Sequence, residues 1–349
     1  MIRRMIKFAA LAATVGLGAC EKQLVVQNPN SGDTERVLGT PNDAEALIST
    51  YYKRWSSGVF GSITDLEGMA DIFGMMSYSS LANNCMNSHS PFVGATNFNQ
   101  PGNTCNAEQL RLYSVLNEVQ RIASNFLTQE ATGGLTLGSP ARDNRAKSFA
   151  EFLRGLSLGY LALMHDSSAV ITTGTIGEDP GALLPYTVVM DSAKAALQRA
   201  IDIASAPATG GSGFPLPNSW LPTPTSLTAP EFVKLIRSYR ARLAADVART
   251  PAERKAANWA AIIADAQNGI SQDHLITTST TVGPSLSWRS QYETFGLWHQ
   301  MPPPIIGMAD VSGSYAAYIG QAVTERGGGN SGFFMVTPDL RFPQGATRA

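Results

Sequence analysis

The sequence predicts a mainly α fold of paired helices, followed by an irregular region with short strands. Two observations lead to this prediction. Before residue 270, apolar residues recur every three or four positions over several long stretches, which is the spacing of one helix face. After Gly269 this period disappears, and Gly, Pro and aromatic residues become frequent. We therefore expect a mostly helical scaffold over residues 20–270 and a loop-rich region over residues 271–349.

Six helices are expected from the apolar spacing. Thr40 or Asn42 can cap the start of the first, and Arg142, Arg145 and Lys147 fall in the first turns of the third. Successive helical pairs favour a tetratricopeptide-like scaffold, although the full repeat signature is missing. The expected helices run from Pro41 to Trp55, from about Ala107 to Leu127, from about Ala141 to His165, from Tyr186 to Ala204, from Ala229 to Val247, and from Ala252 to Gly269.

The segments between and after these helices are expected to be loops or short strands. A Gly, Pro, Ser and Thr cluster between Ala206 and Ala229 predicts a long surface connection. The β-branched run from Thr277 to Val282 indicates a short strand, and Ser314 to Thr324 has room for a helical turn or two. The chain of 349 residues, 44% of them hydrophobic, is long enough to bury a substantial core.

The first 20 residues are typical of a bacterial lipoprotein signal. A basic start precedes an apolar, alanine-rich run from Phe8 to Leu17, which is shorter than a transmembrane helix. The residues Leu-Gly-Ala-Cys that end at Cys20 form the lipid-attachment motif. We expect residues 1–19 to be removed and Cys20 to carry acyl chains such as palmitate, several of which anchor a protein stably. An ordinary signal peptide with a chance cysteine is the alternative.

The residues after this motif indicate location and partners. Glu21 stands where an aspartate would be the usual inner-membrane retention signal, which favours the outer membrane. Loss of the signal removes three of the 26 basic residues and leaves 23 against 27 acidic ones, a net charge of about −4. This balance gives no reason to expect a nucleic-acid partner. No later segment has the roughly 18 uninterrupted apolar residues of a transmembrane helix.

Two further cysteines, Cys85 and Cys105, lie in a segment rich in Asn, Ser, Gly and Pro. An oxidising cell envelope favours a disulfide between them. Closing this loop would contribute about 3 kcal/mol in the chain-entropy model. Free thiols and a metal site that includes His89 stay open as alternatives, although two cysteines and one histidine make a weak zinc pattern.

Several segments resemble the SusD/RagB family of outer-membrane nutrient-binding lipoproteins. The most specific is Arg145–Leu163, which is similar to the family's helix with an Ala-Lys/Glu start, Phe-Leu-Arg-Ala, and then Tyr and Leu. The resemblance covers most of the chain. The other matching segments are Leu24–Asn30, Pro41–Trp55, Leu112–Asn125, Asp191 onward, Arg240–Ala244 with Trp259 after it, and Pro338–Phe342.

The resemblance implies one SusD-like domain over residues 20–349 and a non-catalytic role at the cell surface. Such a lipoprotein captures oligosaccharides or peptides and delivers them to a TonB-dependent, SusC-like transporter, without a cofactor. Family members are commonly longer, so a truncated reading frame stays open. An envelope-anchored glycoside hydrolase and a helical-repeat scaffold that binds only protein are the alternatives.

Four aromatic residues in expected loops are candidates for stacking on sugar rings, although large aromatics often fill cores instead. They are Trp220, Trp288, Tyr292 and Trp298.

Catalytic and metal-binding signals are weak. The sequence contains no His-Glu-x-x-His, Walker or Gly-x-Ser-x-Gly motif. The neighbouring carboxylates Asp65 and Glu67, and Glu178 and Asp179, suit a solvated surface better than a glycosidase pair, which needs a defined spatial separation. The four histidines have no ligand spacing, so we expect no metal site.

Overall fold

The computed structural model describes residues 37–60, 70, 72–75, 78, 102, 105–132, 134–171, 181–206, 214–279, 281–284, 300–326, 332–340 and 342. Within these ranges the chain is mainly helical, which confirms the fold class expected from the sequence. The expected boundary between residues 270 and 271 and the single domain over residues 20–349 stay predictions.

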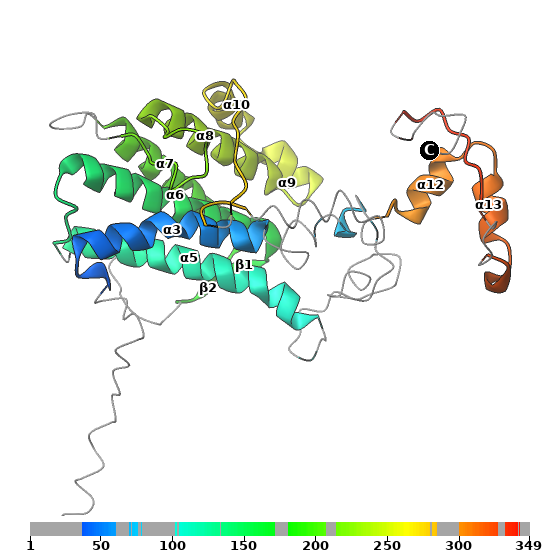
Figure 1. Cartoon of the computed structure of the whole chain (residues 1–349), viewed down its shortest axis with the longest axis horizontal. Coiled ribbons are helices and arrows are strands. Elements are labelled where there is room, and N and C mark those ends of the chain that lie inside the picture. The colour runs from blue at the N-terminus through cyan, green and yellow to red at the C-terminus, as the bar shows by residue number, and fades with distance from the viewer. Residues whose placement is uncertain are drawn as a thin grey trace, which may run out of the picture.

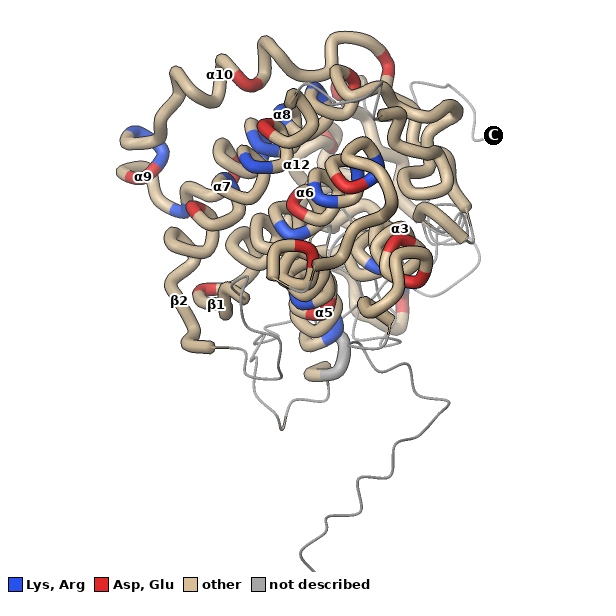
Figure 2. The backbone as a smooth tube through the Cα atoms, turned by 90° about the vertical axis from the view of Figure 1, so that its left-hand side faces the viewer, with Lys and Arg blue, Asp and Glu red and all other residues tan. Residues whose placement is uncertain are grey.

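The main body is a layered stack of antiparallel helices (Figure 1). In chain order, α3 packs on α5, α5 on α6, α6 on α7, α7 on α8, and α8 on α10. Figure 2 shows the same stack from one end. The helices are α3 (Pro41–Val59), α5 (Asn106–Thr132), α6 (Pro140–Met164), α7 (Tyr186–Ser205), α8 (Ala229–Asp246), α9 (Pro251–Ala256) and α10 (Trp259–Gln267).

Helix starts are encoded locally. The Thr40 side chain accepts a hydrogen bond from the Asp43 N–H, so Thr40 and not Asn42 caps α3. The Ser139 side chain caps α6 in the same way, and a proline follows each of these caps at the first helical position. Thr228 and Glu231 form a reciprocal capping box at α8.

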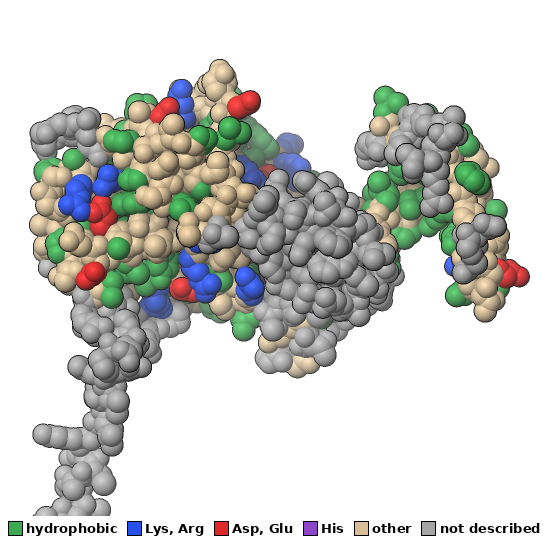
Figure 3. Space-filling model, in the orientation of Figure 1, with side chains coloured by type: hydrophobic (Ala, Val, Ile, Leu, Met, Phe, Trp, Pro, Cys, Tyr) green, Lys and Arg blue, Asp and Glu red, His purple; other side chains and the backbone are tan. Residues whose placement is uncertain are grey.

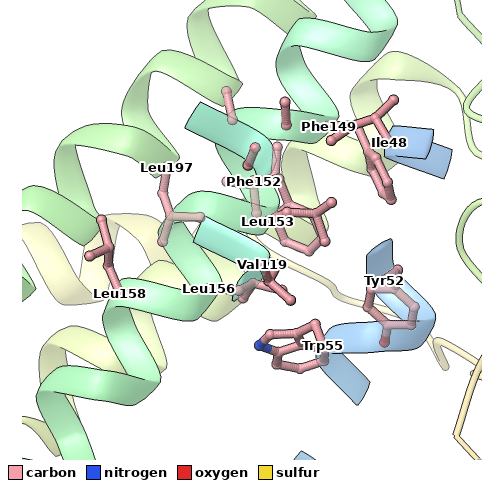
Figure 4. Packing of buried hydrophobic residues seen from close by; sticks show 14 of the residues in the cluster. Ile48, Tyr52, Trp55, Val119, Phe149, Phe152, Leu153, Leu156, Leu158 and Leu197 are labelled. Carbon is pink, nitrogen blue, oxygen red and sulfur yellow. The ribbon is translucent and has the colours of Figure 1, made fainter. Parts of the chain in front are cut away.

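Helix α6 lies at the centre of the core. Its side chains from Ser148 to Ala162 are buried without interruption, so it contacts neighbours on every side. Figure 4 shows Phe152 and Leu156 of α6 close to Trp55 of α3 and Val119 of α5. A helix that is buried all round needs apolar residues beyond a single stripe, and the Arg145–Leu163 segment supplies them.

Two glycines of α6 allow the neighbouring helices to approach closely. A Cβ at Gly155 would lie 2.6 Å from Leu197 Cγ of α7, and a Cβ at Gly159 would lie 2.5 Å from Leu243 Cδ1 of α8. Real Cβ atoms are essentially never found at such distances. The segment that resembles the SusD/RagB family therefore encodes how closely three helices pack.

In the part of the chain that the structure describes, the two paired strands lie inside the helical body. Strand β1 (Ser167–Ala169) pairs antiparallel with β2 (Leu183–Pro185), with Ser168 opposite Leu184. The prediction of a strand over residues 277–282 is wrong for residues 277–279 and 281–282, which are not in a strand. Thr277 instead donates its backbone N–H and its hydroxyl to the carbonyl oxygen of Pro222, which holds an irregular segment against the body.

The described part of the connection between α7 and α8 is not the surface loop that its composition predicts. Leu216 and Leu227 form a bridge through two backbone hydrogen bonds of 2.8 and 3.0 Å. Trp220, Leu221 and Thr223 between them are buried. A few large apolar side chains in a proline-rich segment are enough to fold its described part, residues 214–228, back onto the core.

The helix expected from Ala252 to Gly269 is two helices. Ala257 is extended, with ψ at 145°, and ends α9. The Asn258 side chain then accepts from the Ala261 N–H and starts α10. The Trp259 indole N–H donates to the Arg254 carbonyl at 2.9 Å and holds this corner. An asparagine cap inside an apolar period therefore ended one helix and began another.

The described C-terminal part contains short helices. α12 (Pro303–Ala309) packs against α13 (Ser314–Ile319), and a 3-10 turn (Val323–Glu325) follows, which confirms the expected helical turns after Ser314. Figure 3 shows green side chains over the surface of this part. Met308, Val323, Phe334 and Leu340 are between 78% and 87% exposed.

One carboxylate, that of Asp310, holds together a turn in this part in which no residue is buried. Asp310 accepts hydrogen bonds from the Ser312 hydroxyl and from the backbone N–H groups of Tyr315 and Val336. These bonds hold the pKa of Asp310 well below its ordinary value. The turn is therefore organised by polar contacts and not by a core.

Candidate functional site

A groove of about 800 Å³ lies between α7 and α8 on one side and α9 and α10 on the other. Alanines are the commonest residues in its walls, and Met190 and Val247 also line it. Because alanine side chains are short, the helices can pack closely at Asp265 and still leave an open space beside it. The alanines that line the groove are Ala195, Ala244, Ala248, Ala256, Ala257, Ala261 and Ala264.

One end of the groove is lined by a hydrogen-bond network around Asp265. Its carboxylate accepts from Arg237 at 2.9 Å and from Arg240 at 2.5 and 2.6 Å. Arg240 also donates to the Gln198 side chain of α7. The Asp265 side chain is 10% exposed, so the network joins α10 to α8 and α7 in a largely dry setting.

The other end of the groove is built around Tyr186. Its hydroxyl donates to Glu253 at 2.7 Å, and the Arg249 guanidinium lies 3.9 Å from the centre of its ring. The Tyr186 hydroxyl and the Arg249 backbone N–H lower the pKa of Glu253 by hydrogen bonding. Arg249 also donates to the carbonyls of Ala162 and His165, which end α6.

The charges that line the groove cancel one another. The cations are Lys194, Arg237 and Arg240, and the anions are Asp191, Glu253 and Asp265. Lys194 pairs with Asp191 at 2.7 Å, and the other carboxylates have the partners given above. The groove thus has no net charge, and its carboxylates are already engaged.

The charged residues at the start of the Arg145–Leu163 segment attach α6 to its neighbours. Arg145 donates to Glu45 of α3 at 2.6 Å, and Arg142 donates to the same carboxylate. Lys147 pairs with Glu130 of α5 at 2.9 Å. The sequence pattern reveals these cations but not their partners, which lie on other helices.

The next charged pair of this segment is buried. Glu151 accepts from Arg199 of α7 at 2.6 and 3.0 Å and lies 3.7 Å from Arg154. Arg154 also donates to the Ile171 carbonyl at 2.8 Å. Burial lowers the pKa of Arg154, and the nearby Glu151 opposes that effect. The charged positions of the segment therefore fix helix positions.

Of the four expected stacking aromatics, only Trp220 lies in the described residues. It is 5% exposed, its ring is 5.3 Å from that of Phe149, and the Arg145 guanidinium lies 5.0 Å from its centroid. The structure therefore corrects its assignment to a stacking platform: Trp220 fills the core. Trp288, Tyr292 and Trp298 lie outside the described residues.

Of the three cysteines, Cys105 lies in the described residues. Cys105 is buried and disulfide-bonded, while Cys20 and Cys85 lie outside the described residues. The Cys85–Cys105 pairing and lipidation at Cys20 stay predictions.

The remaining candidates for chemistry are scattered. His89, His299 and the two neighbouring carboxylate pairs lie outside the described residues, which contain no group of three or more His, Cys, Asp or Glu placed to hold a metal ion. Burial lowers the pKa of both His165 and His274, so the neutral imidazole is favoured at each. Within the same ranges, no helix combines the length and apolarity needed to cross a bilayer.

The groove and the exposed apolar side of α10 are not predicted from the sequence. Trp259 and Ile263, four residues apart, are 40% and 52% exposed. The one buried residue of α10 is Asp265. An ordinary surface helix buries its apolar side chains and exposes its charged ones, whereas α10 does the opposite. The sequence signal for this arrangement is a single acidic residue, Asp265, within an otherwise apolar helix.

Comparison with known proteins gives one distant structural similarity. No protein-family model matches the sequence, and no curated protein matches it. Among solved structures, the chain is similar to a SusD-like carbohydrate-binding protein from Bacteroides vulgatus ATCC 8482, with a TM-score of 0.42 and 15% identity. The match covers 69% of this chain and 47% of that one, so the chain spans about half of that protein's length. The carbohydrate binding in its description is a property of that protein.

Proposed function

We propose that this chain is a non-catalytic, lipid-anchored binding protein of the outer membrane that captures oligosaccharides, or peptides, for a TonB-dependent transporter. The observation that carries the proposal is the Arg145–Leu163 segment. It resembles the SusD/RagB family most closely, and it forms the central helix whose ion pairs and glycines set the positions of α3, α5, α7 and α8. The lipid-attachment motif at Cys20 supplies the tether.

The chemistry of the described carboxylates supports binding without turnover. Glu45, Glu151 and Asp265 each lie against arginines of other helices. A general acid needs a proton to donate, and a nucleophile needs a free lone pair facing substrate, whereas these three groups are occupied in structural ion pairs. A rigid scaffold of this kind suits loops that present aromatic side chains to a sugar.

Ligand capture is assigned to the aromatic residues of the loop-rich region, Trp288, Tyr292 and Trp298. Isothermal titration of the full mature chain against oligosaccharide and peptide panels tests this assignment. We expect saturable binding without product formation, weakened about tenfold or more by Trp288→Ala or Trp298→Ala, which corresponds to at least about 1.4 kcal/mol. Trp259→Ala is the matched control, because it removes an exposed tryptophan outside that region, and it should leave the affinity unchanged.

Three results separate this proposal from its alternatives. Product formation that a single carboxylate substitution abolishes would indicate a glycoside hydrolase. A chain that binds no oligosaccharide or peptide in either panel would favour a scaffold for protein partners. Co-purification with an outer-membrane barrel tests the transporter partner, and Cys20→Ser should move the protein from the membrane fraction to the soluble fraction if the lipid anchors it.

A further inference from the structure

Most polar side chains that line the groove between α7, α8, α9 and α10 are already bonded to other groups of the protein. A sugar presents hydroxyls that must find hydrogen-bond partners once they leave water. Here Asp265 is engaged by two arginines, Glu253 by the Tyr186 hydroxyl, and one face of the Tyr186 ring by Arg249. The fitting occupant is therefore one that brings apolar side chains and satisfies its own backbone.

An α-helix meets that requirement, because its backbone N–H and C=O groups are paired internally. The size also fits. A helix about 10 Å wide would fill the groove volume of about 800 Å³ over about two turns. The alanines on both walls allow close approach of a helix ridge, in the way that Gly155 and Gly159 allow it inside the core.

Charge indicates which helix would fit. Residues 229–267, which form α8, α9 and α10, contain seven basic and four acidic residues, a net charge of +3, whereas the whole chain has a net charge of −1. Arg254 and Lys255 end α9 beside the groove and are exposed, and no ion pair is found for either within the described residues. Acidic side chains on an incoming helix would complement this edge.

We propose that this groove binds an amphipathic helix of a partner protein, with small or medium apolar side chains facing the alanines and acidic residues beside Arg254 and Lys255. The proposal is separate from ligand capture by the loop-rich region, because it uses different residues and a different occupant. The partly exposed Ile262, on the α10 wall, would be covered by the bound helix.

The test uses two fluorescein-labelled 16-residue helical peptides with the same Leu/Ala ridge, one with glutamates beside the ridge and one with lysines. Fluorescence anisotropy with the full mature chain should show saturable binding of the glutamate peptide, at least about tenfold tighter than that of the lysine peptide. Ala261→Phe fills the groove and should weaken binding at least about tenfold. The matched control is Ala260→Phe on the adjacent exposed position outside the groove, which should change it less than about twofold.

Circular dichroism melting of both variants checks that they fold. Lack of saturable binding by both peptides would overturn the proposal, as would equal weakening by Ala261→Phe and Ala260→Phe. Competition by an oligosaccharide would assign the groove to a sugar instead. Concentration-dependent dimerisation that Ala261→Phe removes would assign it to a second copy of the chain. The glycan titrations of the loop-rich region are measured separately, so failure of one proposal does not imply failure of the other.

Discussion

Helix α6 is buried along most of its length, whereas helix α10 buries one residue, the acidic Asp265, and exposes Trp259 and Ile263. Both helices hold a carboxylate against arginines of neighbouring helices, Glu151 in α6 and Asp265 in α10. In α6 the ion pair adds to extensive apolar packing. In α10 it takes the place of that packing, which leaves the apolar side chains available for another molecule.

The largest effect is expected from Glu151→Ala in α6. It removes the carboxylate that pairs with both Arg154 and Arg199. The Arg154 side chain is 8% exposed. Breaking a buried pair from one side leaves an uncompensated charge, so we expect a loss of about 4 kcal/mol in the free energy of unfolding. Urea denaturation measures it. Asp191→Ala, which breaks an exposed pair with Lys194, is the control and should change stability by less than about 0.5 kcal/mol.

The second prediction concerns the close approach of α8 to α6. Gly159→Ala places a Cβ against Leu243, so we expect a loss of about 2 kcal/mol from overpacking. Leu243→Ala in the same chain should relieve the clash, and the double variant should lose less than the sum of the two single losses. Gly320→Ala in the C-terminal part, where a Cβ would lie 3.4 Å from its nearest neighbour, is the control and should not destabilise the protein. An additive double variant would contradict this account.

An effect of similar size, but more local, is expected in α10. Asp265→Ala removes hydrogen bonds from Arg237 and Arg240, which should cost about 2 kcal/mol. Because α10 buries no other residue, its amides should exchange hydrogen faster while those of α6 stay protected. Hydrogen–deuterium exchange with mass spectrometry measures both. Equal loss of protection in α6 and α10 would mean that the two helices unfold together and that the comparison is wrong.

The predictable part of the fold is the part that local chemistry determines. Thr40 and Ser139 show how a cap followed by proline marks a helix start, and the apolar period of α6 indicates its length. The break at Asn258 was missed because an asparagine cap inside an apolar run looks like one polar position of a longer helix. The buried connection around Trp220 was missed because composition favoured a loop, while long-range packing decided its place.

The groove could not be read from the sequence for a related reason. Alanines such as Ala261 carry no strong pattern, and their role here depends on how far apart α7 and α10 lie. The partners of Arg145 and Glu151 in α6 were equally hidden, because Glu45 and Arg199 lie far from α6 in the sequence. The sequence marks α6 as the segment that most resembles the SusD/RagB family. The structure shows that the charged residues of this segment attach α6 to other helices.

The smallest effect tests whether charge or packing attaches α6 to α3. Burial raises the pKa of Glu45, but the hydrogen bonds and positive charges of Arg142 and Arg145 together lower it by more, so the pKa lies below its ordinary value of 4.5. A depressed carboxyl pKa stabilises the fold above the unfolded value, and this contribution is lost as the pH falls through the folded value.

Glu45→Gln should therefore cost about 0.5–1 kcal/mol at pH 7, the range of a partly exposed pair, and the difference from the parent chain should shrink between pH 4.5 and pH 3. Urea midpoints across that range measure it, with Glu118→Gln at the more exposed Arg54 pair as the matched control. A Glu45→Gln difference that stays constant down to pH 3 would mean that the shape and hydrogen bonding of this side chain, and not its charge, hold α6 against α3.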